Sequence, residues 1–284
     1  MPKKLIQCVV VIYECTLENS RTLQSLAACF RNQSNLAQQI TLLIYDNSRH
    51  SQQANLDHWI CGAVNYHHAL ENGGLSAAYN EALSLARQGG LEWLLLLDQD
   101  TVLHPDLLPA LFAAITSSPQ ADICAIAPKL KQRGKIISPQ IVGRFRNYDY
   151  PAASSGIQHM PVTAFNSAAC MRVEAVTKVG GFPNAYWLDY LDHIMFHRLQ
   201  AVGGRVLILD AVMEHQLSLQ NLEMEMSLDR YANVLAAEWR FVRETGWGGG
   251  EGVHRLRLFK RTMLYAIKLH NKAYALMTLR AVLA

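Results

Sequence analysis

Short apolar runs alternate along the chain with stretches of helical periodicity. Continuous apolar runs predict strands buried on both faces, and apolar residues spaced three or four apart predict amphipathic helices. The predicted strands cover residues 5–13, 40–45, 63–66, 91–97, 123–127 and 205–209, and the predicted helices cover 17–32, 75–87, 105–117, 184–202 and 228–244. This alternation predicts an α/β fold with a Rossmann-like, mostly parallel sheet and helices on both faces.

Two stretches interrupt the alternation. Residues 129–160 break into short pieces rich in Gly, Ser, Pro, Arg and Tyr, which predicts a loop region on the acceptor side of a site rather than a second domain. The glycine-rich segment 246–252 predicts a flexible break, and residues 253–284 predict a final helical segment.

Length and composition exclude several classes of protein. The 284 residues suit one large domain with an appended segment, and 50% hydrophobic with 17% charged residues indicates a folded globular chain. The net charge of +3 is too small to indicate a nucleic-acid partner. Six scattered cysteines without a C-x-x-C pair favour the reducing cytoplasm. Without a cleavage-site pattern or an apolar run near ~18 residues, we expect a soluble or membrane-surface protein.

Asp98 and Asp100 follow directly behind the apolar run 93–97. The carboxyl edge of strands in an open α/β sheet is where ligands bind. Two carboxylates this close repel each other unless a cation lies between them, and a divalent cation prefers such oxygens together with a substrate phosphate. The pair therefore predicts an Mg²⁺ or Mn²⁺ site, with helix capping as the alternative.

Three further loops carry polar groups after predicted strands. Each is ordinary as a turn or a helix start, but together they would line one crevice with the two carboxylates. Asp46 could then accept a hydrogen bond from a base imide, and the glycines would let a ligand approach a helix backbone. The loops are Tyr13-Glu14, Asp46-Asn47-Ser48 and Asn72-Gly73-Gly74.

These segments, in this order and spacing, resemble the donor half of family 2 glycosyltransferases. The resemblance rests on residues 9–13, 46–48, 72–80 and 97–100, and continues through 180–182 and 188–192 to Arg198, roughly residues 5 to 220 in all. It implies a GT-A fold over residues 1–245, with a donor half to about 128 and an acceptor half from 129. It also implies a nucleotide-diphosphate sugar donor and Mg²⁺ or Mn²⁺.

The resemblance assigns roles residue by residue. Asp46 matches the residue that reads the uracil or thymine base, and Asp98 matches the one near the ribose and metal. Asp100 matches the metal ligand, Asp192 the catalytic base, and His215 a late histidine that often completes the metal site. The donor-binding segments contribute Tyr13, Glu14, Asn72, Gly73, Gly74 and Asn80.

The chain departs from the family pattern at three positions. Glu14 stands where Asn or Arg is usual, and Leu191 and Ile194 stand where carboxylates usually flank the base. Asp189, one helical turn before Asp192, is expected to replace them in part. The resulting Asp-Tyr-x-Asp form looks most like bacterial rhamnosyltransferases of O-antigen synthesis, which implies dTDP-L-rhamnose as donor, with UDP-sugars as the alternative.

The chemistry of inverting transfer supports the assignment of the base. One carboxylate must take the acceptor hydroxyl proton while metal and phosphate contacts stabilise the leaving diphosphate. The alternative for Asp189 and Asp192 is a solvated helix face, which the aromatic neighbours disfavour. His215 could equally be a surface histidine. Further cations could contact the diphosphate or the acceptor, or could simply be solvated; they are Lys129, Arg144 and Arg146.

Other enzyme classes fit less well. The segment 98–102 matches the Asp-x-Asp motif of haloacid-dehalogenase-type phosphatases, but those carry it on the first strand and need a later acidic pair. A nicotinamide enzyme lacks its G-x-G-x-x-G after the first strand. A non-catalytic sugar-nucleotide binder remains an alternative, because Leu191 and Ile194 replace carboxylates.

The C-terminal segment 253–284 is basic and amphipathic. It carries seven Lys and Arg residues and no acidic residue, interleaved with apolar residues. This pattern predicts an element at an anionic membrane surface, on the inner face of the cytoplasmic membrane, where a lipid-linked acceptor would lie. The alternative is a helix packed on the core or at a homodimer interface.

Overall fold

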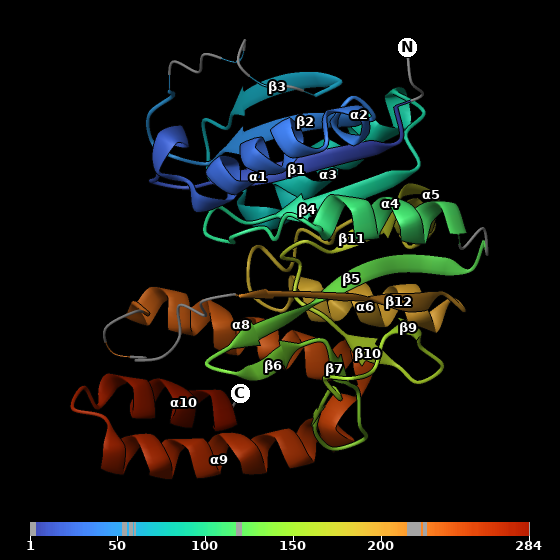
Figure 1. Ribbon diagram of the computed structural model, residues 1–284. Coiled ribbons are helices and arrows are strands. Elements are labelled where there is room, and N and C mark those ends of the chain that lie inside the picture. Colours follow the sequence, from blue (N-terminus) through green and yellow to red (C-terminus); the bar gives the residue numbers. More distant parts are fainter. Residues whose placement is uncertain are drawn as a thin grey trace. The chain divides into compact units, whose positions relative to one another are not determined.

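The computed structural model describes residues 4–52, 56, 59, 61–117, 121–214, 223 and 226–283. The chain forms two compact units. The first comprises residues 1–141 and 149–216, and the second comprises residues 142–148 and 217–284. Figure 1 shows the sheet-containing part in blue to yellow and the C-terminal helices in orange and red.

The first unit contains the predicted sheet. Its strand order is β3-β2-β1-β4-β11-β5-β12-β9, and β6 also pairs with β5. The pairs β1–β2, β1–β4, β2–β3 and β5–β12 are parallel, whereas β11 runs antiparallel to β4 and β5. The long strands are β1 (Ile6–Ile12), β2 (Ile40–Asp46), β3 (Ala63–His68), β4 (Trp93–Leu97), β5 (Ile123–Gln132), β11 (Cys170–Arg172) and β12 (Arg205–Glu214).

Helices cover both faces of this sheet (Figure 1). Alternate residues of a strand point to opposite faces, so the apolar runs of β1 and β4 supply two cores. One face packs against α1 (Arg21–Asn32), α2 (Ser34–Ala37) and α4 (Leu107–Ser117). The helix α3 (Gly74–Gln88) contacts β1, β4 and the short helix α5 (Val173–Lys178). The predicted mostly parallel sheet with helices on both faces is thus confirmed.

The segment 129–160 contains more strand than its composition predicts. β5 runs on to Gln132 and is followed by β6 (Lys135–Ser138), β7 (Gln140–Ile141), β8 (Tyr148–Asp149) and β9 (Gly156–Ile157). β7 pairs antiparallel with β10 (Val162–Thr163). Lys129, on β5, is buried and donates to Asp210 Oδ1 at 2.7 Å and to the carbonyl of Ala152 at 2.8 Å. Its charge is therefore paired inside the first unit.

The second unit is helical. It contains α8 (Leu228–Thr245), the single turn η2 (Trp247–Gly249), α9 (Gly250–Lys268) and α10 (Ala273–Leu283). The other single turn, η1 (Leu17–Asn19), belongs to the first unit. Tyr231, Leu235 and Trp239 of α8 share one core with Leu258 of α9 and Tyr274 of α10. The residues around 246–252 are a turn inside this unit, because Gly246, Gly248, Gly249 and Gly250 all have positive φ.

This grouping differs from the boundaries that the sequence suggested. We expected residues 228–244 to belong to the catalytic domain and residues 253–284 to stand apart as one segment. α8 instead packs with α9 and α10, and the final segment is a helical hairpin rather than one helix. One apolar face of α8 packs against the inner face of α9, which removes both from water.

Candidate active site

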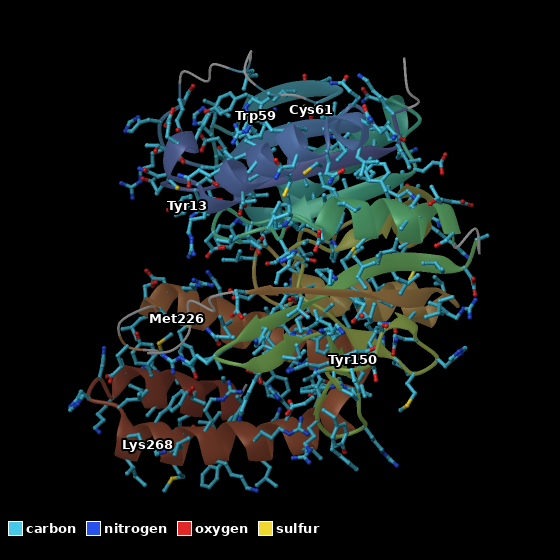
Figure 2. All side chains as sticks on the ribbon, in the orientation of Figure 1. Tyr13, Trp59, Cys61, Tyr150, Met226 and Lys268 are labelled. Carbon is cyan, nitrogen blue, oxygen red and sulfur yellow. The ribbon has the colours of Figure 1, made fainter. Side chains whose placement is uncertain are left out.

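The carboxyl ends of β1, β2 and β4 meet at one edge of the sheet. In the parallel pairings Ile12 lies beside Asp46, and Val10 lies beside Leu97. The residues that follow these strands therefore emerge side by side. β1 lies between β2 and β4, so this edge is the switch point at which open α/β sheets bind ligands. Tyr13 projects at this edge and is 47% exposed (Figure 2).

The turn that carries Asp100 is fixed to neighbouring loops. The Gln99 side chain accepts from the Tyr13 amide at 2.7 Å, and the Gln99 carbonyl accepts from the Ser20 hydroxyl at 2.8 Å. Thr22 donates its hydroxyl to the Thr101 carbonyl at 2.8 Å. Asp100 itself is exposed, so the anchored turn presents its carboxylate to solvent.

Asp98 lies deeper and is oriented by two hydroxyls. Ser167 donates to Asp98 Oδ2, and Tyr79 donates to Asp98 Oδ1 at 3.4 Å. Tyr79 is fully buried in α3, and Ser167 precedes β11. The sequence gave no reason to select Ser167; the register of β11 beside β4 is what brings it there.

Asp46 is fully buried, and both of its carboxylate oxygens are engaged. Oδ1 accepts from the Ser48 amide at 2.9 Å. Oδ2 accepts from the Tyr66 hydroxyl at 2.7 Å and from the Gln52 amide group at 3.0 Å. Gln52 also donates to the Cys15 carbonyl at 3.0 Å, so this cluster ties the loops after β1 and β2 together.

The start of α3 is occupied by another part of the same chain. The Leu75 amide donates to the Trp187 carbonyl at 2.9 Å, and the Trp187 indole donates to the Asn72 carbonyl at 3.0 Å. A Cβ at Gly74 would lie 2.6 Å from Trp187 Cδ1. The glycine that we expected to admit a ligand makes room for Trp187 instead, whereas Gly73 is the N-cap of the helix.

Asp192 lies in the first turn of α6 (Leu191–Ala201). The predicted helix begins late: Tyr190 has a left-handed backbone with φ 64° and is the N-cap, so Asp189 and Asp192 do not share one helix face as expected. Asp192 Oδ1 accepts from the His193 amide at 2.7 Å, and His193 Nδ1 lies 2.8 Å from the Thr163 hydroxyl.

The raised pKa values of two groups in the first unit, Tyr79 and Cys15, show which carboxylates lie near each of them. Burial raises the pKa of Tyr79, and the charges of Asp98 and Asp192 raise it further. Burial also raises the pKa of the Cys15 thiol, to which the charges of Asp100 and Asp46 contribute. These four acidic residues, which come from three separate parts of the chain, thus act in pairs on shared neighbours.

Several residues next to these site residues have a left-handed backbone conformation. Among the described residues other than glycine, four have positive φ: Glu14, Arg133, Ala168 and Tyr190. Glu14 follows β1, Ala168 follows Ser167, and Tyr190 precedes Asp192 by two positions. Such backbone costs on the order of 1–3 kcal/mol per residue and occurs mainly where the surrounding structure serves a site.

Several predicted site residues have other partners or lie elsewhere. Asn80 exchanges two hydrogen bonds with the Phe182 backbone, at 2.7 and 2.9 Å, so it anchors the 180–182 loop rather than offering its amide to a donor. Glu14 accepts from the Arg49 amide at 3.1 Å. Arg144 and Arg146 belong to the second unit, stacked on Phe145 and Tyr148. His215 lies outside the described residues.

The described residues offer two carboxylates to a cation. They contain no group of three or more His, Cys, Asp or Glu side chains placed to hold a metal ion. Asp98 and Asp100 nevertheless suit Mg²⁺ or Mn²⁺, because such ions are usually held by one or two carboxylates together with substrate phosphates. No described hydrogen bond engages the Asp100 carboxylate, which leaves it able to bind.

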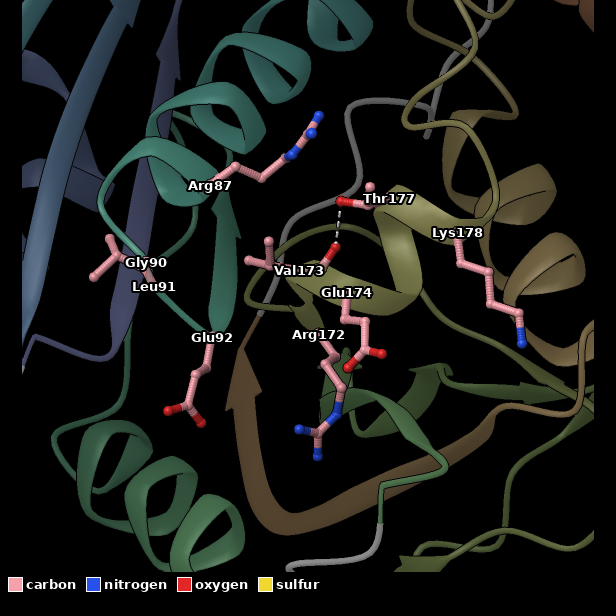
Figure 3. A pocket seen from close by; sticks show the side chains of 9 residues that line it. All are labelled: Arg87, Gly90, Leu91, Glu92, Arg172, Val173, Glu174, Thr177 and Lys178. Carbon is pink, nitrogen blue, oxygen red and sulfur yellow. Dashed lines mark hydrogen bonds between the residues drawn. The ribbon is translucent and has the colours of Figure 1, made fainter.

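A pocket at the opposite edge of the sheet is separate from this site. It is lined by Arg87, Glu92, Arg172, Glu174 and Lys178, with Gly90, Leu91, Val173 and Thr177 (Figure 3). Glu92 precedes β4, and Arg172 pairs with Trp93 at the amino end of that strand. The guanidinium of Arg172 lies over the Trp93 ring, 4.5 Å from its centre. This cation–π contact stabilises the packing of β11 against β4.

Comparison with known proteins decides between the enzyme classes. The model of the glycosyl transferase family 2 matches residues 8–176, and that of the glycosyl transferase family group 2 matches residues 93–283. The chain belongs to glycosyltransferase family 2. It is therefore a transferase, and the phosphatase and nicotinamide alternatives are set aside. No curated protein matches the chain by sequence.

Solved structures show the same fold. A crystal structure of S. aureus TarS residues 1–349 is 13% identical, with a TM-score of 0.52 over 96% of this chain and 90% of that chain. A longer S. aureus TarS structure is 12% identical, with a TM-score of 0.51 over 96% of this chain and 55% of that one. A mycobacterial protein is 12% identical, with a TM-score of 0.50 over 86% of this chain and 76% of that one. The GT-A fold is confirmed.

Proposed function

We propose that the protein is an inverting, divalent-cation-dependent glycosyltransferase that uses a nucleotide-diphosphate sugar. The observation that carries this proposal is that the carboxyl ends of β1, β2 and β4 meet at one edge of the sheet, where hydrogen bonds to neighbouring residues fix Asp98 and the turn that carries Asp100. We assign to this site a carboxylate suited to the cation, Asp100, and a carboxylate suited to a proton transfer, Asp192; the influence of both Asp98 and Asp192 on the raised pKa of Tyr79 supports the assignment. Both are required when a sugar moves with inversion.

Asp98 and Asp100 would hold Mg²⁺ or Mn²⁺ together with the donor diphosphate, and His215 is the further ligand that the family resemblance implies. When bound, the cation neutralises charge on the departing diphosphate. The hydrogen bonds from Tyr79 and Ser167 fix the rotamer of Asp98 before any ligand arrives. This preorganisation avoids an entropic cost when the donor binds.

Asp192 would take the proton of the acceptor hydroxyl as its oxygen attacks the anomeric carbon. It lies in the first turn of α6, and the His193 amide fixes one of its oxygens. The buried Leu191 and Ile194 flank it where carboxylates are usual, so Asp192 acts with an apolar support.

The donor we propose is dTDP-L-rhamnose, with UDP-sugars as the alternative; the Asp-Tyr-x-Asp sequence at 189–192 supports rhamnose. For Asp46 the burial of its carboxylate supports a positioning role. It would shape the loop that receives the base, with direct contact to the base requiring Gln52 or Tyr66 to release it.

The acceptor we propose is a lipid-linked or polysaccharide chain of a cell-surface glycan, extended at the cytoplasmic side of the membrane. This rests on the rhamnosyltransferase-like segment and on the basic C-terminal unit. Among the described residues no helix is both long and apolar enough to cross a bilayer.

A donor panel tests the proposal. Purified protein would be incubated with Mn²⁺, a defined glycan acceptor and either dTDP-L-rhamnose or a UDP-hexose, with the linkage determined by NMR. We expect transfer from dTDP-L-rhamnose with inversion at the anomeric carbon. Transfer from UDP-hexoses but not from dTDP-L-rhamnose would show that the donor is a UDP-sugar. Retention of configuration at the anomeric carbon would overturn the assignment of Asp192 as the base.

A further inference from the structure

The outer face of α9 carries apolar side chains that the second unit does not cover. Its inner face buries His254, Leu258 and Thr262 against the other helices. On the opposite face lie four apolar residues that are 48–77% exposed: Leu256 (55%), Phe259 (48%), Met263 (52%) and Ile267 (77%). We call these four residues the α9 stripe.

The α9 stripe is continuous along the helix. At 3.6 residues per turn its members fall within about 80° of one another and extend over about 17 Å. Single exposed apolar residues are normal on protein surfaces, but an aligned row indicates a surface that another phase or molecule covers. Figure 2 labels Lys268 at the end of this helix.

Basic residues border the α9 stripe. Lys260 lies beside it and Lys268 follows its last member, and both are exposed. Arg255 precedes the stripe, but its guanidinium lies over the Trp239 ring of α8, 5.5 Å from the ring centre. Residues 253–284 contain seven Lys and Arg and no acidic residue. Of these cations Arg261 is neutralised, because Glu238 of α8 accepts from its guanidinium at 2.8 and 2.9 Å. The cations beside the stripe belong to the outer face.

We propose that the α9 stripe binds an anionic phospholipid surface, with Phe259 and Met263 entering the acyl boundary and Lys260 and Lys268 at the headgroups. Apolar residues flanked by cations are the pattern of a helix that lies in the membrane interface. A second copy of the chain fits this face poorly, because a two-fold contact would set the same cations of both copies against each other. The inference does not depend on the proposed transfer activity.

Vesicle flotation of the full chain tests this inference. With phosphatidylglycerol-containing vesicles we expect binding that neutral phosphatidylcholine vesicles do not support and that added salt weakens. Met263→Gln combined with Phe259→Gln should lower the apparent vesicle affinity roughly tenfold. Lys260→Gln should lower it about fivefold.

Matched controls separate this surface from general effects. Met160→Gln changes a methionine that is 62% exposed in the first unit, and Lys178→Gln changes an exposed lysine there; neither should affect flotation. Circular dichroism confirms that each variant is folded. The proposal is overturned if the intact chain ignores anionic vesicles, or if Phe259→Gln with Met263→Gln binds them unchanged. It is also overturned if sedimentation shows a dimer that these substitutions dissociate.

Discussion

At the scale of single residues, Asp192 is the group whose removal best separates binding from chemistry. Asp192→Asn keeps the shape of the side chain but cannot accept a proton. We expect donor binding to persist, by calorimetric titration, and the transfer rate to fall on the order of 10²–10⁴-fold. Asp229→Asn, at an exposed carboxylate of α8, is the control, and a variant at 192 that retains most of its turnover would move the base elsewhere.

A substitution at Asp100 tests whether this residue is a ligand of the divalent cation. Its carboxylate is exposed on an anchored turn, and Asp100→Ala removes it without touching the Asp98 hydrogen bonds. We expect Mn²⁺ no longer to strengthen nucleotide binding in calorimetry. Asp106→Ala, at another exposed carboxylate, should leave that effect intact. Equal Mn²⁺ dependence in both variants would exclude Asp100 as a ligand.

His254 gives the second unit a pH-dependent stability. Burial lowers its pKa, the Glu238 charge opposes this, and Arg261 and Arg257 add to it. Neither ring nitrogen has a hydrogen-bond partner among the described residues. The unfolded chain therefore binds the proton more readily, so stability falls as pH drops below about 6.5 and onward to the lowered pKa of the folded state.

To test this, the midpoint of unfolding is measured at a series of pH values from 7.5 to 5. His254→Leu removes the titrating group while keeping an apolar contact with Trp239, whose ring lies 4.6 Å from the imidazole. We expect the variant to lose part of the acid sensitivity of the intact chain. An unchanged pH profile would assign that sensitivity to other groups.

At the scale of elements, the start of α3 is the most constrained backbone near the site. Gly74 has φ +70°, and a Cβ there would collide with the Trp187 backbone and ring. Gly90 has a similar φ of +63° but nothing within 4 Å. Gly90→Ala should therefore cost only the left-handed backbone, about 1–2 kcal/mol, and Gly74→Ala should cost more.

Denaturant unfolding compares the stability losses of the two variants. Assays of sugar transfer measure the activity of each variant. We expect Gly74→Ala to reduce activity as well as stability, because Trp187 must move and Asp192 follows it in the chain. Gly90→Ala should keep normal activity. Equal stability losses in the two variants would mean that Trp187 yields without cost.

The elements show what the sequence could reveal. Buried strands such as β4 and the helix α3 follow from periodicity, because local patterns fix them. The start of α6 does not, since the left-handed Tyr190 has no sequence signal. The partners of Asp46 also arise only in the fold: the pairing of β2 with β3 brings Tyr66 to it, and the loop after β2 turns Gln52 back onto it.

At the scale of the whole molecule, the two units should respond differently when the C-terminal residues are removed. Removing residues 253–284 would uncover Tyr231, Leu235 and Trp239, which pack against α9 and α10. We expect a chain ending at Gly252 to aggregate, and one ending at Gln216 to stay soluble because it lacks α8 as well. Size-exclusion chromatography and circular dichroism compare the two; a monomeric, cooperatively unfolding 1–252 chain would contradict the shared core.

The contact of Trp187 with the first turn of α3 has a thermodynamic consequence. It joins a loop of the donor half to the segment that continues into Asp192, through the Leu75 amide and the Asn72 carbonyl. A donor that shifts the start of α3 must therefore shift the acceptor side as well. Linkage makes such communication reciprocal: by whatever factor the donor alters acceptor affinity, the acceptor alters donor affinity by the same factor.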